Sequence, residues 1–272
     1  MNAAAKADIR AIAVEPGVRL AVRVEGSEGK PALVFSNSLA ADMSTWDKVA
    51  ARLAPHARIV RYDTRGHGRS DVPEGPCDIA RLGQDVIALL DALRIEKAVL
   101  CGLSLGGLTG MWLGVHAPDR ISGLVLANTA ASFPPASMWQ DRAKAARASG
   151  SVADLVEPTL SRWFTPSFRA AHPHEVAQVG AVIGATPAAG YAAACEVLAA
   201  TDLSGDLSRI ALPTCVVVGA HDPSTPPARG AELQAGIPGA RLVSLDAAHL
   251  SCVEAADAFA DTLIAFLSRL AA

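Results

Sequence analysis

The stretch that decides the fold is A-V-L-C-G-L-S-L-G-G at residues 98–107. Residues 98–101 are apolar and predict a buried strand, and residues 105–117 predict a helix that ends before Pro118. Between them, Gly102, Ser104 and Gly106 form the pattern G-x-S-x-G. Small residues on both sides of the serine let backbones approach closely around a sharp, strained turn. The sequence therefore predicts a strand–turn–helix unit that presents a serine hydroxyl at the end of a strand.

Outward from this unit, strands and helices alternate along most of the chain. The predicted strands cover residues 9–14, 18–24, 32–36, 58–62, 98–101, 121–127, 214–219 and 241–245. The predicted helices of the alternating part cover residues 44–53, 79–93, 105–117, 228–235 and 254–270. This alternation predicts an α/β fold with a mostly parallel eight-stranded sheet, flanked by helices on both faces.

Residues 132–209 break the alternation. The block is rich in alanine, mainly helical in pattern, and punctuated by prolines such as Pro134, Pro135 and Pro158. Because it lies between two predicted strands, we expect a helical lid inserted over the carboxyl edge of the sheet, where open α/β sheets bind ligands. The predicted domains are a core of residues 1–131 and 210–272 and a lid of residues 132–209.

Composition and charge exclude several classes of protein. The chain has 272 residues, of which 51% are hydrophobic and 19% charged, so it can build a large packed core. A formal net charge of −3 without a basic run argues against a nucleic-acid surface. Three long uncharged stretches, at residues 98–118, 121–140 and 176–195, are interrupted by Gly, Pro or polar residues. We expect them to be buried segments rather than membrane spans.

The cysteines and the N-terminal residues favour a cytoplasmic protein. The cysteines at positions 77, 101, 195, 215 and 252 are widely spaced and form no C-x-x-C pair. Free thiols of this kind are typical of a reducing compartment. Residues 1–17 carry charges and lack the apolar stretch of a secretory signal. No ligand set for a metal or an organic cofactor is visible, so we expect none.

A serine hydroxyl is a weak nucleophile until a base accepts its proton and a third group orients that base. On a turn of this kind, the acid and then the histidine follow the serine along the chain. Asp222 follows strand 214–219 and His249 follows the last predicted strand, so these are the candidate acid and base for Ser104. Asp246 is the rival acid, but it lies only three residues before the histidine. The other histidines, which we expect in other roles, are at positions 56, 67, 116, 172, 174 and 221.

An attacked carbonyl needs two backbone N–H donors for its developing negative charge. We expect one from Leu105, directly after the serine, and the other from the turn at residues 37–39, where Leu39 is favoured. Arg65 and His67 lie in the glycine-punctuated loop D-T-R-G-H-G-R-S. Polar groups in such loops commonly satisfy backbone groups, so we favour a structural role for both.

Together these motifs resemble those of the α/β-hydrolase fold family, and more narrowly those of the 3-oxoadipate enol-lactonases. The landmarks are F-S-N-S-L (35–39), R-Y-D-T-R-G-H-G-R-S (61–70), C-G-L-S-L-G-G-L-T-G (101–110), W-L-G-V-H-A-P-D-R (112–120), L-V-L-A-N-T-A-A (124–131), W-F-T-P (163–166), G-A-H-D-P-S-T-P-P (219–227) and D-A-A-H-L-S (246–251). The Asn-Ser-Leu turn, A-N-T-A-A and H-D-P-x-T-P-P look specific to the lactonases. Asn37 and Ser38 stand where many relatives in the wider superfamily carry His-Gly.

The resemblance implies that water opens 3-oxoadipate enol-lactone to 3-oxoadipate through an acyl-enzyme, late in the bacterial breakdown of aromatic compounds (the β-ketoadipate pathway). The partner is then a small anionic lactone, and the pocket is expected to supply a cation or several N–H donors. The basic residues of the lid block are Arg142, Lys144, Arg147, Arg162 and Arg169. Among them we favour Arg142 for the carboxylate, with Trp139 as an apolar wall and Trp163 as a further wall candidate.

Two other functions fit the same residues. A broad carboxylesterase or perhydrolase uses the same three side chains, and pocket shape decides between substrates. A ligand receptor or scaffold on a hydrolase fold fits less well, because such proteins often lose members of the triad. A haloalkane dehalogenase is disfavoured, because it needs a carboxylate where Ser104 stands.

Overall fold

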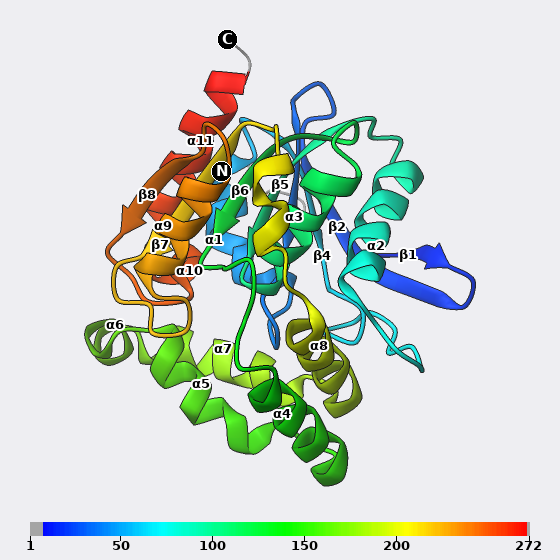
Figure 1. The fold of residues 1–272 in the computed structure, drawn as a ribbon, viewed down its shortest axis with the longest axis vertical. Coiled ribbons are helices and arrows are strands. Elements are labelled where there is room, and N and C mark those ends of the chain that lie inside the picture. The colour runs from blue at the N-terminus through cyan, green and yellow to red at the C-terminus, as the bar shows by residue number, and fades with distance from the viewer. Residues whose placement is uncertain (1–7, 271–272) are drawn as a thin grey trace.

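The computed structural model describes residues 8–270, and within them one eight-stranded sheet runs through the molecule (Figure 1). The strands are β1 (Arg10–Glu15), β2 (Val18–Gly26), β3 (Ala32–Ser36), β4 (Arg58–Tyr62), β5 (Ala98–Leu103), β6 (Ile121–Ala127), β7 (Thr214–Gly219) and β8 (Arg241–Leu245). Their order across the sheet is β1-β2-β4-β3-β5-β6-β7-β8. The β1–β2 and β2–β4 pairs are antiparallel and the other neighbouring strands run parallel. The predicted mostly parallel sheet is therefore confirmed.

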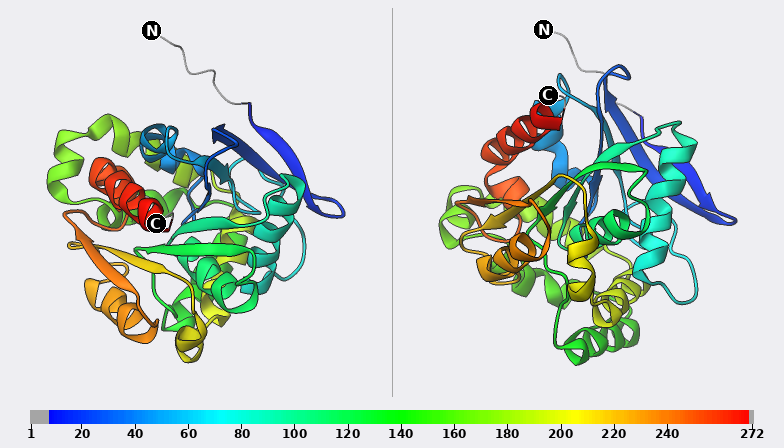
Figure 2. Two further views of the ribbon diagram at one scale, coloured as in Figure 1. Left: turned by 90° about the horizontal axis from the view of Figure 1, so that it is seen from above. Right: turned by 45° about the horizontal axis from the view of Figure 1, so that its top comes forward.

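Helices cover both faces of the sheet (Figure 2). Those packed on it are α1 (Asp47–Leu53), α2 (Ile79–Ala92), α3 (Leu105–His116), α9 (Pro227–Gly236) and α11 (Ala256–Leu270). Helices α1 and α11 pack together on one face, while α2, α3 and α9 cover the other. The predicted helix at residues 254–270 is divided in the structure, because Ala255 leaves helical geometry between the short α10 (Ser251–Glu254) and α11.

The helices between β6 and β7 lie together beyond the edge of the sheet where the parallel strands end (Figure 1). They are α4 (Ala136–Ser149), α5 (Val156–Trp163), α6 (Pro166–Ala171), α7 (Pro173–Ala185) and α8 (Ala188–Ala200). We call residues 132–209 the insertion. No single helix within residues 8–270 is long and apolar enough to cross a membrane, and α7 with α8 meets those criteria only as a pair bent by 91°.

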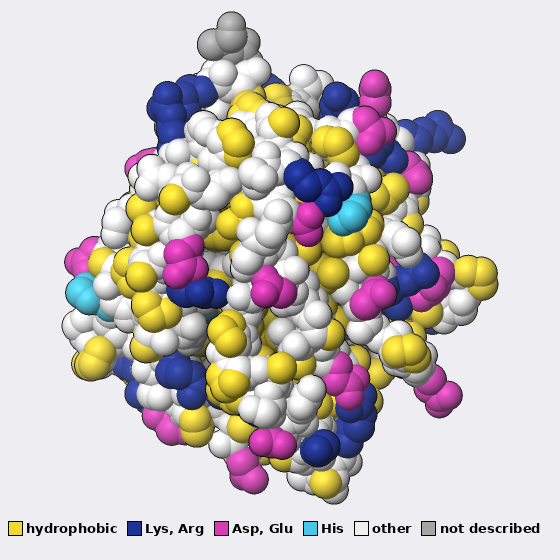
Figure 3. All heavy atoms as spheres, viewed as in Figure 1, with side chains coloured by type: hydrophobic (Ala, Val, Ile, Leu, Met, Phe, Trp, Pro, Cys, Tyr) yellow, Lys and Arg dark blue, Asp and Glu magenta, His cyan; other side chains and the backbone are white. Residues whose placement is uncertain are grey.

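The core sits on both faces of the sheet and is built from the apolar residues of the strands. Every residue of β5 and β7 is buried, as expected for central strands covered on both faces. On the α1/α11 face, Trp46 stacks on Phe35 with ring centroids 4.5 Å apart and also contacts Phe259. The face shown in Figure 3 carries acidic and basic side chains interspersed with one another, which is typical of a solvated surface.

Candidate active site

The turn between β5 and α3 holds Ser104 in a strained backbone conformation, with φ of 56° and ψ of −112°. A side chain at Gly102 would place a Cβ 2.1 Å from the carbonyl oxygen of Gly106. A side chain at Gly106 would place one 2.2 Å from the carbonyl oxygen of Ser36. The two glycines of the G-x-S-x-G pattern are thus required by close backbone approach, and the turn lifts the serine to the end of the sheet.

The loops after β7 and β8 bring Asp222 and His249 together. The Nδ1 atom of His249 lies 2.8 Å from Oδ2 of Asp222, and both side chains are buried. The same carboxylate accepts hydrogen bonds from the backbone N–H groups of Ser224 (2.8 Å) and Thr225 (3.0 Å) and from the Thr225 hydroxyl (2.6 Å). The rival acid, Asp246, lies at the surface, where it pairs with His221.

The surroundings of Asp222 keep it ionised. Burial by itself raises the pKa of this carboxyl, but the electrostatic interaction with His249 and the hydrogen bonds from His249, Thr225 and Asn128 outweigh burial and lower the pKa to about 2. A carboxylate in this position holds the imidazole of His249 with Nδ1 protonated, which leaves Nε2 free to accept a proton.

Ser104 and His249 border the same cavity, which has a volume of about 210 Å³. Within residues 8–270, no hydrogen bond joins the Ser104 hydroxyl directly to the His249 ring. Hydrogen bonds between a nucleophile and its base are often long without substrate and tighten in the complex. The arrangement brings the candidate nucleophile, base and acid to one site.

The predicted oxyanion donors come from two sides of the site. Leu105 is the first residue of α3, where backbone N–H groups have no partner within the helix. Leu39 borders the cavity from the turn after β3. The side chain of Asn37 holds this turn, because its Nδ2 donates to the carbonyl of Tyr62 (2.7 Å) and its Oδ1 accepts from Nε1 of Trp46 (2.8 Å).

The insertion supplies the cations of the cavity. Arg142 from α4 lies over the ring of Trp139, with its Cζ atom 4.8 Å from the ring centroid, and both residues border the cavity. Arg162 from α5 also borders it, and burial, with a further contribution from Arg142, lowers its pKa. Arg147 and Arg169, in contrast, pair with glutamates at the surface of the insertion. Sequence reasoning named Arg162 only as one of several basic residues in the insertion.

Arg65 and His67 lie away from this cavity. The Arg65 guanidinium donates to both carboxylate oxygens of Asp85 in α2, at 2.6 and 2.5 Å, and pairs with Glu15 in β1. His67 is fully buried, with Nδ1 3.2 Å from the carbonyl oxygen of Arg65, and burial lowers its pKa. These contacts connect the loop to the core and agree with the structural role favoured for both residues.

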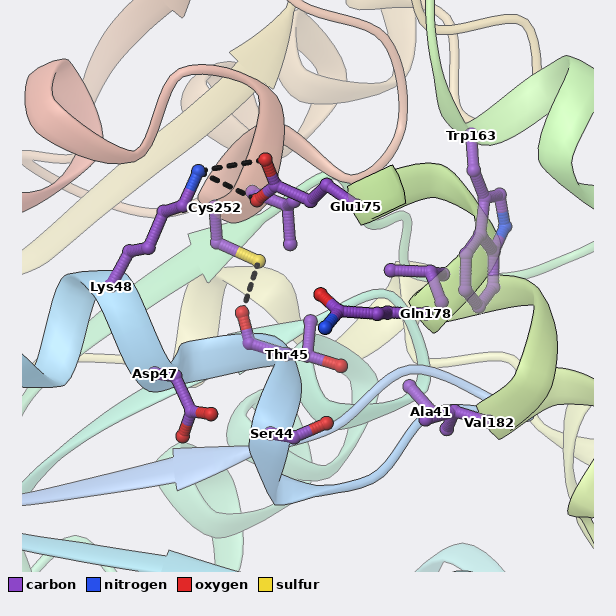
Figure 4. Close-up of a pocket in the computed structure, with 12 residues that line it drawn as sticks. Ala41, Ser44, Thr45, Asp47, Lys48, Trp163, Glu175, Gln178, Val182 and Cys252 are labelled. Carbon is purple, nitrogen blue, oxygen red and sulfur yellow. Dashed lines mark hydrogen bonds and ion pairs between the residues drawn. The ribbon is translucent and has the colours of Figure 1, made fainter. Parts of the chain in front are cut away.

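A second cavity, of about 320 Å³, lies between the core and the insertion (Figure 4). Trp163 borders both this cavity and the one at Ser104. Lys48 of α1 and Glu175 of α7 form an ion pair of 2.7 Å beside it. The thiol of Cys252 points toward the backbone carbonyl of Thr45. Trp163 therefore forms a wall between the two cavities, and its ring centroid lies 6.1 Å from that of His249.

The proteins of known family that are similar to this chain are α/β hydrolases and enol-lactonases. Residues 31–165 match the family model for the alpha/beta hydrolase fold. The 3-oxoadipate enol-lactonases 2 and 1 of Acinetobacter baylyi are 42% and 40% identical to this chain, over 90% and 93% of its length and 91% and 95% of theirs.

Two solved structures agree with these matches. The enol-lactonase from Burkholderia xenovorans LB400 is 43% identical, with a TM-score of 0.91 over 94% of this chain and 99% of that one. A hydrolase from Pseudomonas aeruginosa is 42% identical, with a TM-score of 0.92 over 98% and 99% of the two chains. The chain belongs to the 3-oxoadipate enol-lactonases, a family of the α/β-hydrolase fold.

Proposed function

We propose that this chain hydrolyses 3-oxoadipate enol-lactone to 3-oxoadipate, with Ser104, Asp222 and His249 as its catalytic triad. One observation carries the proposal: the strained serine and the Asp222–His249 pair meet at a cavity that is also bordered by Arg142 and Arg162. A nucleophile beside two guanidinium groups suits an ester that carries a carboxylate. The names of the relatives, which are enol-lactonases, support the same reaction.

In the first half of the reaction, Nε2 of His249 takes the proton from Ser104 as its Oγ attacks the lactone carbonyl. The backbone N–H groups of Leu39 and Leu105 stabilise the negative oxygen of the tetrahedral intermediate. The intermediate collapses when the bond between the carbonyl carbon and the ring oxygen breaks. The enol oxygen leaves with the proton that His249 carries, and an acyl-enzyme remains.

The second half must prevent the ring from closing again, because the leaving group is still tethered to the acyl chain. Tautomerisation of the enol to the ketone removes that nucleophile and makes the opening effectively irreversible. His249 then takes a proton from water as the water oxygen attacks the acyl carbon, and returns that proton to Oγ of Ser104 when the ester bond breaks and the product leaves. This mechanism requires neither a metal nor an organic cofactor.

The insertion supplies part of the wall of the cavity, and we propose that it acts as a lid. Arg142 and Arg162 hold the substrate carboxylate, while the rings of Trp139 and Trp163 form apolar walls. The proposed location is the cytoplasm, which the five free cysteines support because disulfides are rare in reducing compartments.

The direct experiment follows the loss of the lactone's ultraviolet absorbance with purified protein, beside a Ser104→Ala variant. We expect turnover by the wild type and a loss of at least about a thousandfold in kcat for the variant. A simple aryl ester, assayed in parallel, tests the alternative of a broad esterase. A higher kcat/KM for the aryl ester than for the lactone, or unchanged turnover in the Ser104→Ala variant, would contradict the proposal.

A further inference from the structure

The dipeptide Asn128-Thr129 directly follows β6 and contacts both sides of the proposed triad. The geometry points to a positioning role: Asn128, held by Ser251, orients Asp222 and the loop that carries His249, while Thr129 holds the turn that carries Ser104. This inference rests on the proposed function of the triad. It gives a role to the A-N-T-A-A motif at residues 127–131, which has none in the mechanism above.

Asn128 joins the acid to the loop of the base. Its Nδ2 atom donates to Oδ2 of Asp222 at 2.9 Å, and this is the oxygen that accepts the hydrogen bond from His249. The same nitrogen lies 3.2 Å from the carbonyl oxygen of Ala248, the residue before His249. Asn128 is fully buried and has a φ of 44°, a conformation that favours Asn over most other residues. One amide thus connects two loops that both carry triad residues.

Ser251 fixes the direction of that amide. Its hydroxyl donates to Oδ1 of Asn128 at 2.5 Å, and the serine is fully buried. The carboxylate of Asp222 and the carbonyl of Ala248 can only accept hydrogen bonds, so the end of the amide that faces them must be the –NH2 group. Ser251 satisfies the other end, and no water is needed to hold the amide in place.

Thr129 acts on the nucleophile's side. Its hydroxyl donates to the backbone carbonyl of Ser104 at 2.7 Å. The backbone N–H of Ser104 donates to the carbonyl of Ala127 at 2.9 Å. Both polar backbone groups of the strained residue are therefore bonded to the end of β6. A backbone in a sparsely populated conformation persists only where its surroundings hold it, and Thr129 supplies part of that restraint.

The strand order explains why two adjacent residues can contact both the turn of Ser104 and the side chain of Asp222. In the sheet, β6 lies between β5, which leads to Ser104, and β7, which leads to Asp222. Residues at the carboxyl end of β6 therefore have the nucleophile on one side and the acid on the other. A small error in the relative placement of reacting groups is enough to slow a reaction about a hundredfold. The residues at the carboxyl end of β6 can therefore affect the reaction rate without touching the substrate.

The test measures the rate constant with which a fluorophosphonate labels Ser104, because this rate reports on the activated serine whatever the natural substrate is. Asn128→Ala and Thr129→Val should each lower it about 10- to 100-fold. Their KM for a neutral aryl ester should stay within about 2-fold of wild type, because neither residue borders the cavity. Thr129→Ser keeps the hydroxyl and should label at nearly the wild-type rate.

The matched control is Thr214→Val. Thr214 is also a buried threonine whose hydroxyl donates to a backbone carbonyl, that of Leu212 at 2.9 Å. It lies at the start of β7, at the opposite end of the strand from Asp222. Labelling of this variant should be unchanged. Equal slowing in Thr214→Val and Thr129→Val would mean general destabilisation and would overturn the positioning role.

A double-variant comparison tests the link through Ser251. Ser251→Ala removes one hydrogen bond and should slow labelling about 2- to 10-fold. If Asn128→Ala does not fold, this variant still tests the role of Asn128. Because Ser251 acts through Asn128, adding Ser251→Ala to Asn128→Ala should cause no further loss. Multiplied losses, or wild-type labelling in the folded single variants, would overturn the inference and leave the proposed function intact. Failure of the wild type to label would instead contradict the triad itself.

Discussion

Asp222 combines deep burial with five hydrogen-bond donors among the described residues. Burial favours the neutral acid, yet the donors and His249 favour the anion more strongly, and the pKa falls to about 2. In the unfolded chain these partners are absent and the carboxyl titrates near 3.8. The native state therefore releases the proton of Asp222 more readily than the unfolded state does.

This difference predicts how stability depends on pH. Above about pH 5 the carboxylate is ionised in both states, and its native contacts contribute about 2 kcal/mol to the free energy of unfolding. As the pH falls toward 2, protonation removes that contribution. Urea unfolding of wild type and Asp222→Asn from pH 6 to pH 3 should show a stability difference that is largest at pH 6 and shrinks with acidification. A difference independent of pH would contradict the prediction.

Arg142 carries a prediction about substrate charge. Replacing it by glutamine removes a cation from the cavity, so KM for the anionic lactone should rise about 10- to 100-fold. KM for a neutral aryl ester should change much less, because no carboxylate needs neutralising. Steady-state kinetics on both substrates measures the contrast. Lys144→Gln makes the same charge change at an exposed position of α4 and serves as control. Equal effects of Arg142→Gln on the KM of both substrates would contradict the assignment of Arg142 to the substrate carboxylate.

At the scale of elements, α8 of the insertion packs against the core loop at residues 63–70, and the two backbones are in direct contact. A side chain at Gly190 would place a Cβ 1.9 Å from the carbonyl oxygen of Gly66. Gly66 itself has a φ of +77°, which few residues other than glycine adopt. The same loop is tied to α2 by the buried Arg65–Asp85 pair, so it forms a rigid surface for α8.

We therefore predict opposite outcomes for two Gly→Ala substitutions in the insertion. Gly190→Ala forces α8 away from the loop and should lower the free energy of unfolding by about 1–3 kcal/mol. At Gly184 in α7, the new Cβ would meet Val156 at an ordinary 3.4 Å, so alanine should be neutral or stabilising by up to about 1 kcal/mol. Urea denaturation measures both. Similar destabilisation by the two substitutions would show that helix docking at Gly190 is not the cause.

Across the whole molecule, Glu254 couples the insertion to the loop of His249. Its carboxylate accepts hydrogen bonds from the backbone N–H of Ala248 (2.9 Å) and from the backbone and hydroxyl of Thr165. The backbone N–H of Leu250 also donates to the carbonyl of Trp163 at 3.0 Å. Displacement of residues 163–165 would therefore be transmitted to the residues on either side of His249.

Glu254→Ala should loosen both segments together. Amide hydrogen exchange at Ala248 and Thr165 should accelerate about 10- to 100-fold, because hydrogen bonds to a charged group are lost. Glu175→Gln weakens a different connection between core and insertion, the ion pair of Glu175 with Lys48, without touching the His249 loop. Exchange at Ala248 should stay at the wild-type rate in that control. Protection at Thr165 that survives Glu254→Ala would show that the coupling runs elsewhere.

Much of the fold follows from the sequence alone, because strand and helix patterns are local. The apolar run before Gly102 and the glycines around Ser104 are sufficient to predict the strand–turn–helix unit found in the structure. The sequence predicts Asp222 and His249 as partners because each lies a few residues after a strand, and parallel strands end at a common edge. Their roles in catalysis stay predictions, but their proximity was correctly expected.

Only the tertiary structure decided which polar side chains meet at that edge. The sequence favours Arg142, but its pattern does not separate Arg162, which also borders the cavity, from Arg147 and Arg169, which pair with glutamates at the surface. The sequence pattern also does not reveal that Asn128 contacts Asp222. That contact requires β6 and β7 to lie side by side in the sheet, although the whole insertion separates them along the chain. Local periodicity shows which face of an element is apolar, whereas ion pairs and buried hydrogen bonds depend on where distant elements are packed.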